Sequence, residues 1–209
     1  MAGIISFFAN LDRNIAFVIQ NYGVGTYLIL FAIIFLETGI VLAPLLPGDS
    51  LIFVSGTLAA QGLLNVFLLF ALLSLAAILG DSANYWIGHY LGARFFKKSR
   101  LFSRKYFDRA HEFYEKHGGK TIVIARFIPI IRTFAPFVAG IGRMNYARFL
   151  FYNIFGGILW VFIFLFAGFY FGTLSFVQKN LALVILLIII ISLLPAIIEF
   201  LRIKLGKNK

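Results

Sequence analysis

Long apolar stretches alternate with short polar ones along almost the whole chain. A run of about 20 apolar residues is long enough to cross a bilayer as a helix. The pattern therefore predicts transmembrane helices over 27–42, 63–91, 150–172 and 181–201. Because a helix satisfies its own backbone hydrogen bonds inside the bilayer, we expect an all-α integral membrane protein.

Two further apolar segments, 44–61 and 121–142, are each interrupted by prolines. Basic residues dominate the stretch 94–120, which holds nine Lys and Arg, and they recur in the C-terminal tail. Because Lys and Arg concentrate on the cytoplasmic side, both 94–120 and the C-terminal tail should be cytoplasmic. Two spans, 150–172 and 181–201, lie between residue 142 and the tail. Both ends of 121–142 should therefore be cytoplasmic. This segment should then be a re-entrant hairpin, with Pro129 and Pro136 supplying its breaks. The same reasoning makes 44–61 a hairpin that enters from the opposite face.

These elements form one membrane domain over 1–209, with about four transmembrane helices and two re-entrant helical hairpins. Opposed hairpins with similar breaks are typical of an inverted repeat whose binding site lies near the midplane of the membrane. Amphipathic spacing predicts interfacial helices at 1–22 and within 94–120. The distribution of basic residues places both the N-terminus and the C-terminus in the cytoplasm.

Composition narrows the class of protein. The 209 residues are 61% hydrophobic, with a mean hydropathy of +0.95, whereas soluble domains are roughly half apolar. A net charge of +11 would suggest nucleic acid for a soluble protein, but here the basic residues flank apolar runs, so we expect no such partner. The chain has no cysteine, and its three histidines lack metal-ligand spacing, so we expect neither a metal nor a cofactor.

Five charged residues interrupt the apolar segments: Glu37, Asp49, Asp81, Arg126 and Arg132. Each would cost about 2.5–3.5 kcal/mol at the centre of a bilayer. If all five faced lipid, the total cost would rival the stability of a whole domain. We therefore expect these side chains to pair with one another or to line a wet cavity.

Each of these residues also has a purely structural interpretation. Glu37 could be a helix-end carboxylate in the headgroup layer, and Asp49 could cap the short helix that starts there. Asp81 could be a structural partner of an arginine, and the two arginines could form structural salt bridges. The functional alternative is a clamp of two guanidinium groups, in which the proline break lets Arg126 and Arg132 converge on a phosphate.

The same residues lie in four short motifs. The motifs are Glu37 followed by Pro44 and Pro47-Gly48-Asp49; Gly80-Asp81 followed by Tyr85 and Gly88; Arg126-Phe127 followed by Pro129 and Arg132; and Ala139-Gly140. Together they resemble the DedA family of bacterial inner-membrane proteins, also called the SNARE-associated or VTT-domain family, over about residues 25–175. The resemblance implies transmembrane helices with two facing re-entrant hairpins, in the cytoplasmic (inner) membrane of a bacterium.

The resemblance also implies a function in transport. Members of the family are described as transporters of undecaprenyl phosphate or phospholipids, and others as proton-dependent transporters needed for envelope integrity and drug resistance. The family's essential positions map onto Glu37, Asp49, Arg126 and Arg132. We therefore expect a flippase for a lipid phosphate, in which the arginines hold the phosphate and the carboxylates balance charge and exchange protons.

The remaining expectations concern supporting residues and rival functions. A proton-coupled exporter of small cations or drugs is the alternative, with acidic residues binding the cargo. We do not expect an enzyme, because no intramembrane histidine lies beside a nucleophile and no covalent-nucleophile motif is found. The expected supporting residues are Asp81, Tyr85, Pro47, Gly48 and Pro129.

Overall fold

The computed structural model describes residues 23–40, 48–98, 118–180, 183–184 and 186–188. Its regular elements in these ranges are all helices, which confirms the predicted all-α class. The interfacial helix predicted at 1–22, most of the second one predicted within 94–120, and most of the span at 181–201 lie outside the described residues. Pro44 and Pro47 lie outside them as well.

Two long helices form the frame of the molecule. Helix α5 covers Val66–Lys98 and helix α9 covers Tyr146–Phe171. Among the described residues they are the two helices long and apolar enough to cross a membrane, over Val66–Tyr90 and over the whole of α9. They correspond to the spans predicted from Leu63 and from Leu150.

Four shorter helices pack on this frame, and α10, Ser175–Lys179, follows α9. Helix α3 covers Gly25–Gly39 and helix α4 covers Gly48–Ala60. Helix α7 covers Lys120–Ala125, and helix α8 covers Pro129–Ile141. The break predicted at the first proline of this segment is confirmed, because the chain turns between α7 and α8.

The second predicted break is wrong, because Pro136 lies inside α8. A proline cannot donate a hydrogen bond to the turn before it. In that turn the carbonyl of Thr133 accepts a hydrogen bond of 2.7 Å from Asn84 Nδ2 of α5. The carbonyl that an N–H at position 136 would normally reach is that of Arg132, so the bond from Asn84 ties α8 to α5 without replacing the one that Pro136 lacks.

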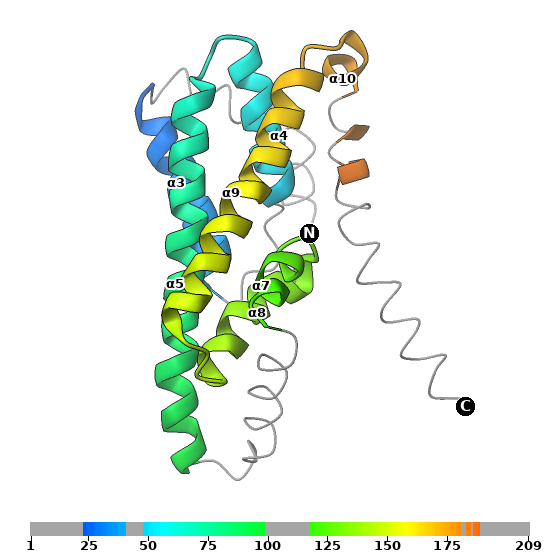
Figure 1. The fold of residues 1–209 in the computed structure, drawn as a ribbon. Coiled ribbons are helices and arrows are strands. Elements are labelled where there is room, and N and C mark those ends of the chain that lie inside the picture. Colours follow the sequence, from blue (N-terminus) through cyan, green and yellow to red (C-terminus); the bar gives the residue numbers. More distant parts are fainter. Residues whose placement is uncertain (1–22, 41–47, 99–117, 181–182, 185, 189–209) are drawn as a thin grey trace, which may run out of the picture.

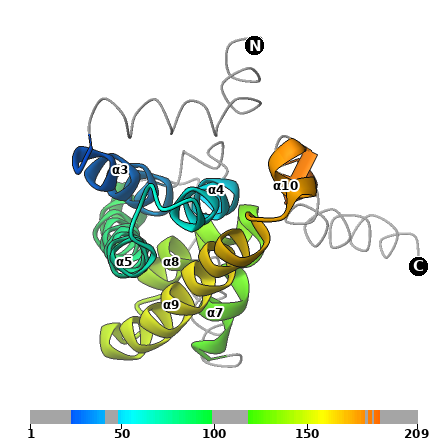
Figure 2. The ribbon, with the colours of Figure 1, turned by 90° about the horizontal axis from the view of Figure 1, so that it is seen from above.

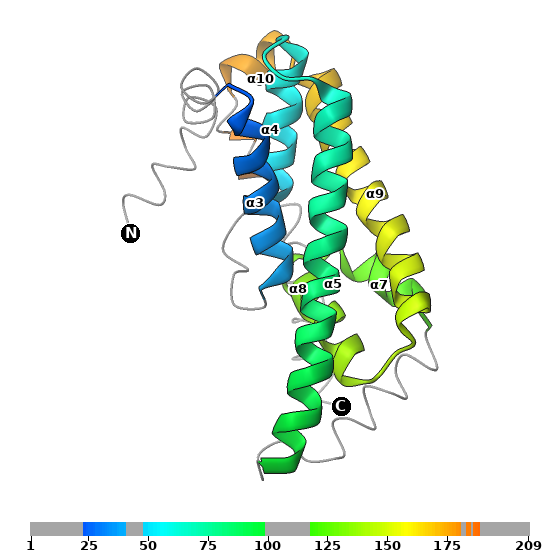
Figure 3. The same ribbon diagram turned by 90° about the vertical axis from the view of Figure 1, so that its left-hand side faces the viewer.

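The helices divide the molecule into two halves along α5. Helices α3 and α4 lie beside its upper part, and α7 and α8 lie beside its lower part (Figures 1 and 3). Helix α9 crosses both halves and contacts α4 as well as α7. Seen from above, the helices surround a common interior, with α5 and α9 on either side of α8 (Figure 2). Helices of both halves therefore pack against α5 and α9.

Glycines allow the closest helix contacts. A Cβ atom on Gly168 of α9 would meet the carbonyl of Phe53, and one on Gly140 of α8 would meet the carbonyl of Tyr85. Backbones approach this closely where small residues replace side chains at a membrane helix interface. Helix α4 is thus packed directly on α9, and α8 directly on α5.

The outer face of α9 is apolar and exposed. Phe151, Phe155 and Phe162 are 68%, 57% and 50% exposed, and Tyr170 is 68% exposed. Soluble monomers rarely present an apolar surface of this extent. This face suits contact with lipid.

Candidate functional site

The first part of the site is an arginine shared by two carboxylates. Arg132 comes from the first turn of α8, Asp49 from the first turn of α4, and Glu37 from the last turns of α3. Arg132 Nη2 donates to Glu37 Oε1, and Arg132 Nη1 donates to Asp49 Oδ1 at 2.7 Å. The three residues are only 8%, 8% and 1% exposed in the order Arg132, Asp49, Glu37. We call this group the Arg132 centre.

The Arg132 centre brings the first turns of two helices together. Asp49 lies in the first turn of α4 and Arg132 in that of α8, so the bond between them joins the two helix N-termini. Backbone N–H groups and the helix dipole make such ends attractive to anions. At the start of α4 the Gly48 N–H donates to Glu37 Oε1 at 3.2 Å. A Cβ atom at Gly48 would overlap the Glu37 carboxylate, so this close approach requires glycine.

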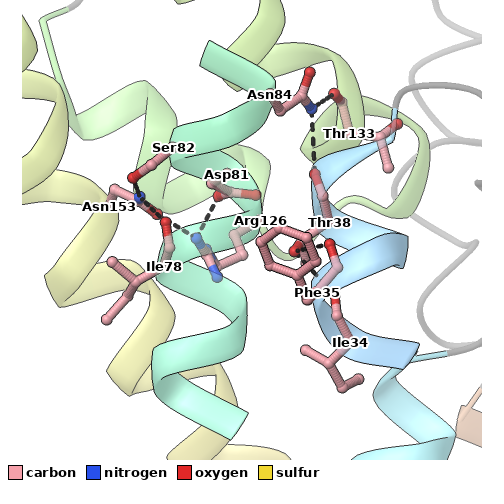
Figure 4. A network of polar contacts seen from close by, with 10 residues as sticks. All are labelled: Ile34, Phe35, Thr38, Ile78, Asp81, Ser82, Asn84, Arg126, Thr133 and Asn153. Carbon is pink, nitrogen blue, oxygen red and sulfur yellow. Dashed lines mark hydrogen bonds and ion pairs between the residues drawn. The ribbon is translucent and has the colours of Figure 1, made fainter. Parts of the chain in front are cut away.

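The second part of the site is built around Arg126, in the turn between α7 and α8 (Figure 4). Arg126 Nη2 donates to Asp81 Oδ2 of α5 and, at 2.5 Å, to Asn153 Oδ1 of α9. Asn153 Nδ2 in turn donates to the carbonyl of Ile78 at 3.0 Å and to Ser82 Oγ at 3.3 Å. We call Arg126, Asp81 and Asn153 the Arg126 centre. Each of its members is at most 5% exposed.

Several buried polar atoms of the two centres have no partner among the described residues. They are Nε and Nη1 of Arg126, Nε of Arg132 and Oε2 of Glu37. Next to the Arg126 guanidinium, α9 carries two glycines. A Cβ atom on Gly157 would lie 3.3 Å from Arg126 Nη1, and one on Gly156 would lie 3.6 Å from Arg126 Nε. A buried donor without a partner is costly, and these N–H groups have room for no more than small residues of α9 beside them.

One aromatic side chain lies against both centres. The Trp160 indole N–H of α9 donates to Asp49 Oδ1 at 2.8 Å. Its ring centroid lies 4.8 Å from Cζ of Arg132 and 5.9 Å from Cζ of Arg126. The two arginines are six residues apart in sequence and belong to different centres. Their guanidinium groups nevertheless lie against the same indole ring.

A buried amide ties the site to its surroundings. Asn84 Nδ2 of α5 donates to the carbonyl of Thr38, at the end of α3, at 3.2 Å, and to the carbonyl of Thr133 in α8 (Figure 4). Asn84 is 0% exposed. One side chain thus holds the ends of helices from both halves beside the charged residues.

The structure decides between some of the alternatives left open by the sequence. Glu37 is 1% exposed and pairs with Arg132, so its carboxylate is enclosed by protein and not by lipid headgroups. Asp49 lies within the first turn of α4 and contacts Arg132 and Trp160, so its environment is more than a helix cap. Asp81 pairs with Arg126, as its structural interpretation required.

The supporting residues fall into different places. The Tyr85 hydroxyl donates to the carbonyl of Met144 at 2.5 Å, and its ring stacks on Phe149, so Tyr85 belongs to a packed cluster that it shares with these two residues. Gly48 contacts Glu37, and Pro129 begins α8.

Sequence reasoning missed three residues, Asn84, Asn153 and Trp160. The two asparagines could have been noticed as amides within otherwise apolar spans. Trp160 carried no such signal. Among the described residues, no group of three or more His, Cys, Asp or Glu side chains is placed to hold a metal ion.

The chain is similar to known membrane proteins. Residues 46–170 match the VTT domain. Protein DedA of Escherichia coli strain K12 is 51% identical over 203 residues, which cover 95% of this chain and 93% of that protein. An uncharacterized membrane protein of Mycobacterium tuberculosis is 43% identical, with 82% of this chain and 77% of that protein covered.

A third relative is the inner membrane protein YqjA of Escherichia coli strain K12. It is 40% identical over 148 residues, which cover 70% of this chain and 67% of that protein. No solved structure matches the chain. The domain match spans more than half of the chain and includes Asp49, Asp81, both buried arginines and Trp160. This chain is therefore a membrane protein of the DedA (VTT-domain) family.

Proposed function

We propose that the protein moves a lipid phosphate, such as undecaprenyl phosphate or a phospholipid, across the cytoplasmic membrane. Two buried guanidinium groups that lie against one indole ring, one of them where two helix N-termini meet, carry this proposal. Three of their nitrogen atoms, Nε and Nη1 of Arg126 and Nε of Arg132, have no partner among the described residues. The phosphate headgroup would bind these donors while the hydrocarbon tail stays in lipid.

The chemistry of the site suits a phosphate. Guanidinium groups bind phosphate oxygens through charge-assisted hydrogen bonds and do not lose their charge. The first turns of α4 and α8 would add backbone donors and the positive ends of two helix dipoles. In the absence of substrate, the carboxylates of Glu37 and Asp49 occupy the donors of Arg132, so a phosphate would have to replace them.

Charge balance supports a role for protons. The two centres contain three carboxylates and two guanidinium groups, which gives a formal net charge of −1 when all are ionised. An added phosphate makes this buried charge more negative, which is costly in a low-dielectric interior. We infer that carboxylates displaced from Arg132 take up protons as the substrate binds and release them as it leaves.

The two arginines would act in sequence. Within the described part of the chain, two nitrogens of Arg126 have no partner, whereas both Nη atoms of Arg132 are engaged by carboxylates. The headgroup would therefore meet Arg126 first. Release of Arg132 from Glu37 and Asp49 would follow, and would loosen the contact between α4 and α8.

The helix arrangement fits this sequence of events. We propose that the segments leading into α4 and into α8 are re-entrant hairpins from opposite membrane faces, related as an inverted repeat, in a layout of about four transmembrane helices. Both α4 and α8 have 13 residues, and both begin at the charged centre. A layout of this kind allows one hairpin to move while the other holds the headgroup.

Reconstituted vesicles test the proposal. Purified protein in liposomes should transfer the headgroup of a fluorescent lipid phosphate between leaflets, and Arg126→Ala and Arg132→Ala should abolish the transfer. Arg148→Ala is the matched control, because this arginine is exposed at the start of α9. Transfer at the normal rate by both buried-site variants would contradict the proposal.

A second candidate function is proton-coupled export of a small cation or drug. The excess of carboxylate over guanidinium favours it, as does Glu37 Oε2, which lacks a partner within the described residues. Cargo-dependent proton flux without lipid transfer in the same vesicles would favour this function. Neither candidate includes a chemical step on the substrate, so the recovered lipid phosphate should be unchanged by mass spectrometry.

A further inference from the structure

We propose that Trp160 is a positioning residue that couples the Arg132 centre to the Arg126 centre during transport. This inference rests on the proposed transport of a lipid phosphate. Trp160 is 1% exposed and lies on α9, a helix that the sequence presents as a plain apolar span. Its indole is in contact with both arginines and with one carboxylate.

The indole N–H shares its acceptor with an arginine. Asp49 Oδ1 accepts one hydrogen bond of 2.8 Å from Trp160 Nε1 and another of 2.7 Å from Arg132 Nη1. When a phosphate draws Arg132 away, Asp49 loses a charged donor in a buried place, which is unfavourable. The indole N–H remains on the same oxygen. Trp160 therefore lowers the free-energy cost of exchanging the carboxylate for the substrate.

The indole ring holds the two cations without using their donors. Cζ of Arg132 lies 4.8 Å and Cζ of Arg126 lies 5.9 Å from the ring centroid. An aromatic face attracts a guanidinium through its quadrupole, so no N–H group is consumed. A carboxylate at this place would instead compete with the phosphate for the same N–H groups.

The position of Trp160 on α9 suits a coupling role. Toward one end of α9, Gly168 packs on Phe53 of α4, and toward the other, Gly156 packs near Val123 of α7. Trp160 lies between these two contacts in the sequence of α9. A movement of either half relative to α9 would therefore change the surroundings of Trp160.

Two substitutions distinguish the contribution of the indole N–H from that of the aromatic ring. Trp160→Phe keeps an aromatic face but removes the donor to Asp49. We expect its KM for the lipid phosphate to rise about tenfold, the value of one hydrogen bond to a charged group, with a smaller change in the rate at saturation. Trp160→Leu removes both contacts and should raise KM further. A wild-type KM in Trp160→Phe would overturn the inference.

Fluorescence gives a reading that a merely structural role would not change. The chain has two tryptophans, and Trp86, in a separate aromatic cluster with Tyr85 and His89, can be replaced by phenylalanine. In this background Asp49→Asn should shift the emission of Trp160 without any lipid. A short-chain prenyl phosphate in nanodiscs should also shift it, whereas the uncharged prenol should not.

The control protein is Trp160→Phe, in which Trp86 remains and should not respond to the prenyl phosphate. An equal response of Trp160 to phosphate and to prenol, or no response to Asp49→Asn, would overturn the inference. If wild-type vesicles transfer lipid phosphate but Trp160→Phe is normal, only the role of Trp160 fails. If wild-type vesicles transfer none, the proposed function fails and the role of Trp160 fails with it.

Discussion

The two arginine centres solve the same physical problem in different ways. Arg132 is held by two carboxylates, Glu37 and Asp49, that come from the opposite half of the molecule. Arg126 is held by one carboxylate and one amide, Asp81 and Asn153, that come from the two long helices. The Arg132 centre therefore joins the two halves of the molecule, which the proposed transport would move relative to each other, whereas the Arg126 centre is anchored to the frame.

The difference predicts that the two centres respond differently to loss of a carboxylate. Asp81→Asn should destabilise the protein by about 3–5 kcal/mol, because Arg126 cannot lose its charge and keeps no other carboxylate among its described ion pairs. Asp49→Asn should cost less, about 1–3 kcal/mol, because Arg132 retains Glu37. Thermal unfolding in detergent measures both. Equal losses of stability would remove the distinction between the centres.

Removal of Arg132 should have a pH-dependent effect that is smaller than that of Asp81→Asn. Arg132→Ala leaves Glu37 and Asp49 buried without their cation, but each carboxylate can take up a proton, so we expect a loss of about 2–3 kcal/mol at neutral pH. The loss should shrink as the pH is lowered and grow as it is raised. Unfolding curves across the pH range test this.

A matched variant separates stability from function at this centre. Glu37→Gln, Asp49→Asn and Arg132→Met together should restore stability, because no buried charge remains unpaired. This triple variant should still transfer no lipid phosphate. A stable triple variant that transports at the normal rate would mean that the charges serve the fold alone.

The amide of the Arg126 centre should be worth less than its carboxylate. Asn153→Ala removes an acceptor of Arg126 and two donations to α5, and should destabilise the protein by about 1.5–3 kcal/mol. Asn153→Asp keeps the acceptor and should retain more transport than Asn153→Ala. The order of the two variants in the vesicle assay is the measurement, and the reverse order would contradict the geometry.

A single methyl group should give the smallest change in stability. In Gly157→Ala the new Cβ would lie 3.3 Å from Arg126 Nη1 and 3.0 Å from Ile78 Cγ1, so the side chains must give by a few tenths of an ångström. We expect a loss of about 1 kcal/mol in stability. Transport should fall more strongly, because the methyl group stands where the phosphate approaches Arg126. Full transport by this variant would place the phosphate elsewhere.

Sequence reasoning found the charged residues because an ionised side chain in an apolar run has few explanations in a membrane. It also found the break before Pro129, where a missing N–H and the turn coincide. It could not assign partners, since Arg126 and Asp81 are 45 residues apart and Arg132 and Glu37 are 95 apart. Such pairs depend on how helices pack, which hydrophobic patterning does not encode.

The errors have physical causes as well. Pro136 does not end α8, although it has no N–H to donate to the turn before it, so the presence of a proline was not enough to locate the end of the helix. Trp160 escaped notice, because an apolar span hides an indole whose N–H is its only polar atom. Its contacts with Asp49 and the two arginines come from elsewhere in the fold, so no local sequence pattern reveals them.

The central claim is that a lipid phosphate binds between the two buried guanidinium groups. Solid-state NMR can measure the dipolar coupling between ¹⁵N of arginine side chains and ³¹P of a prenyl phosphate in membranes that hold the protein. We predict a short-range coupling to guanidinium nitrogen that Arg148→Lys preserves, and that is reduced in Arg126→Lys and in Arg132→Lys. A coupling absent from the wild-type protein, or unchanged in both buried-site variants, would contradict the account.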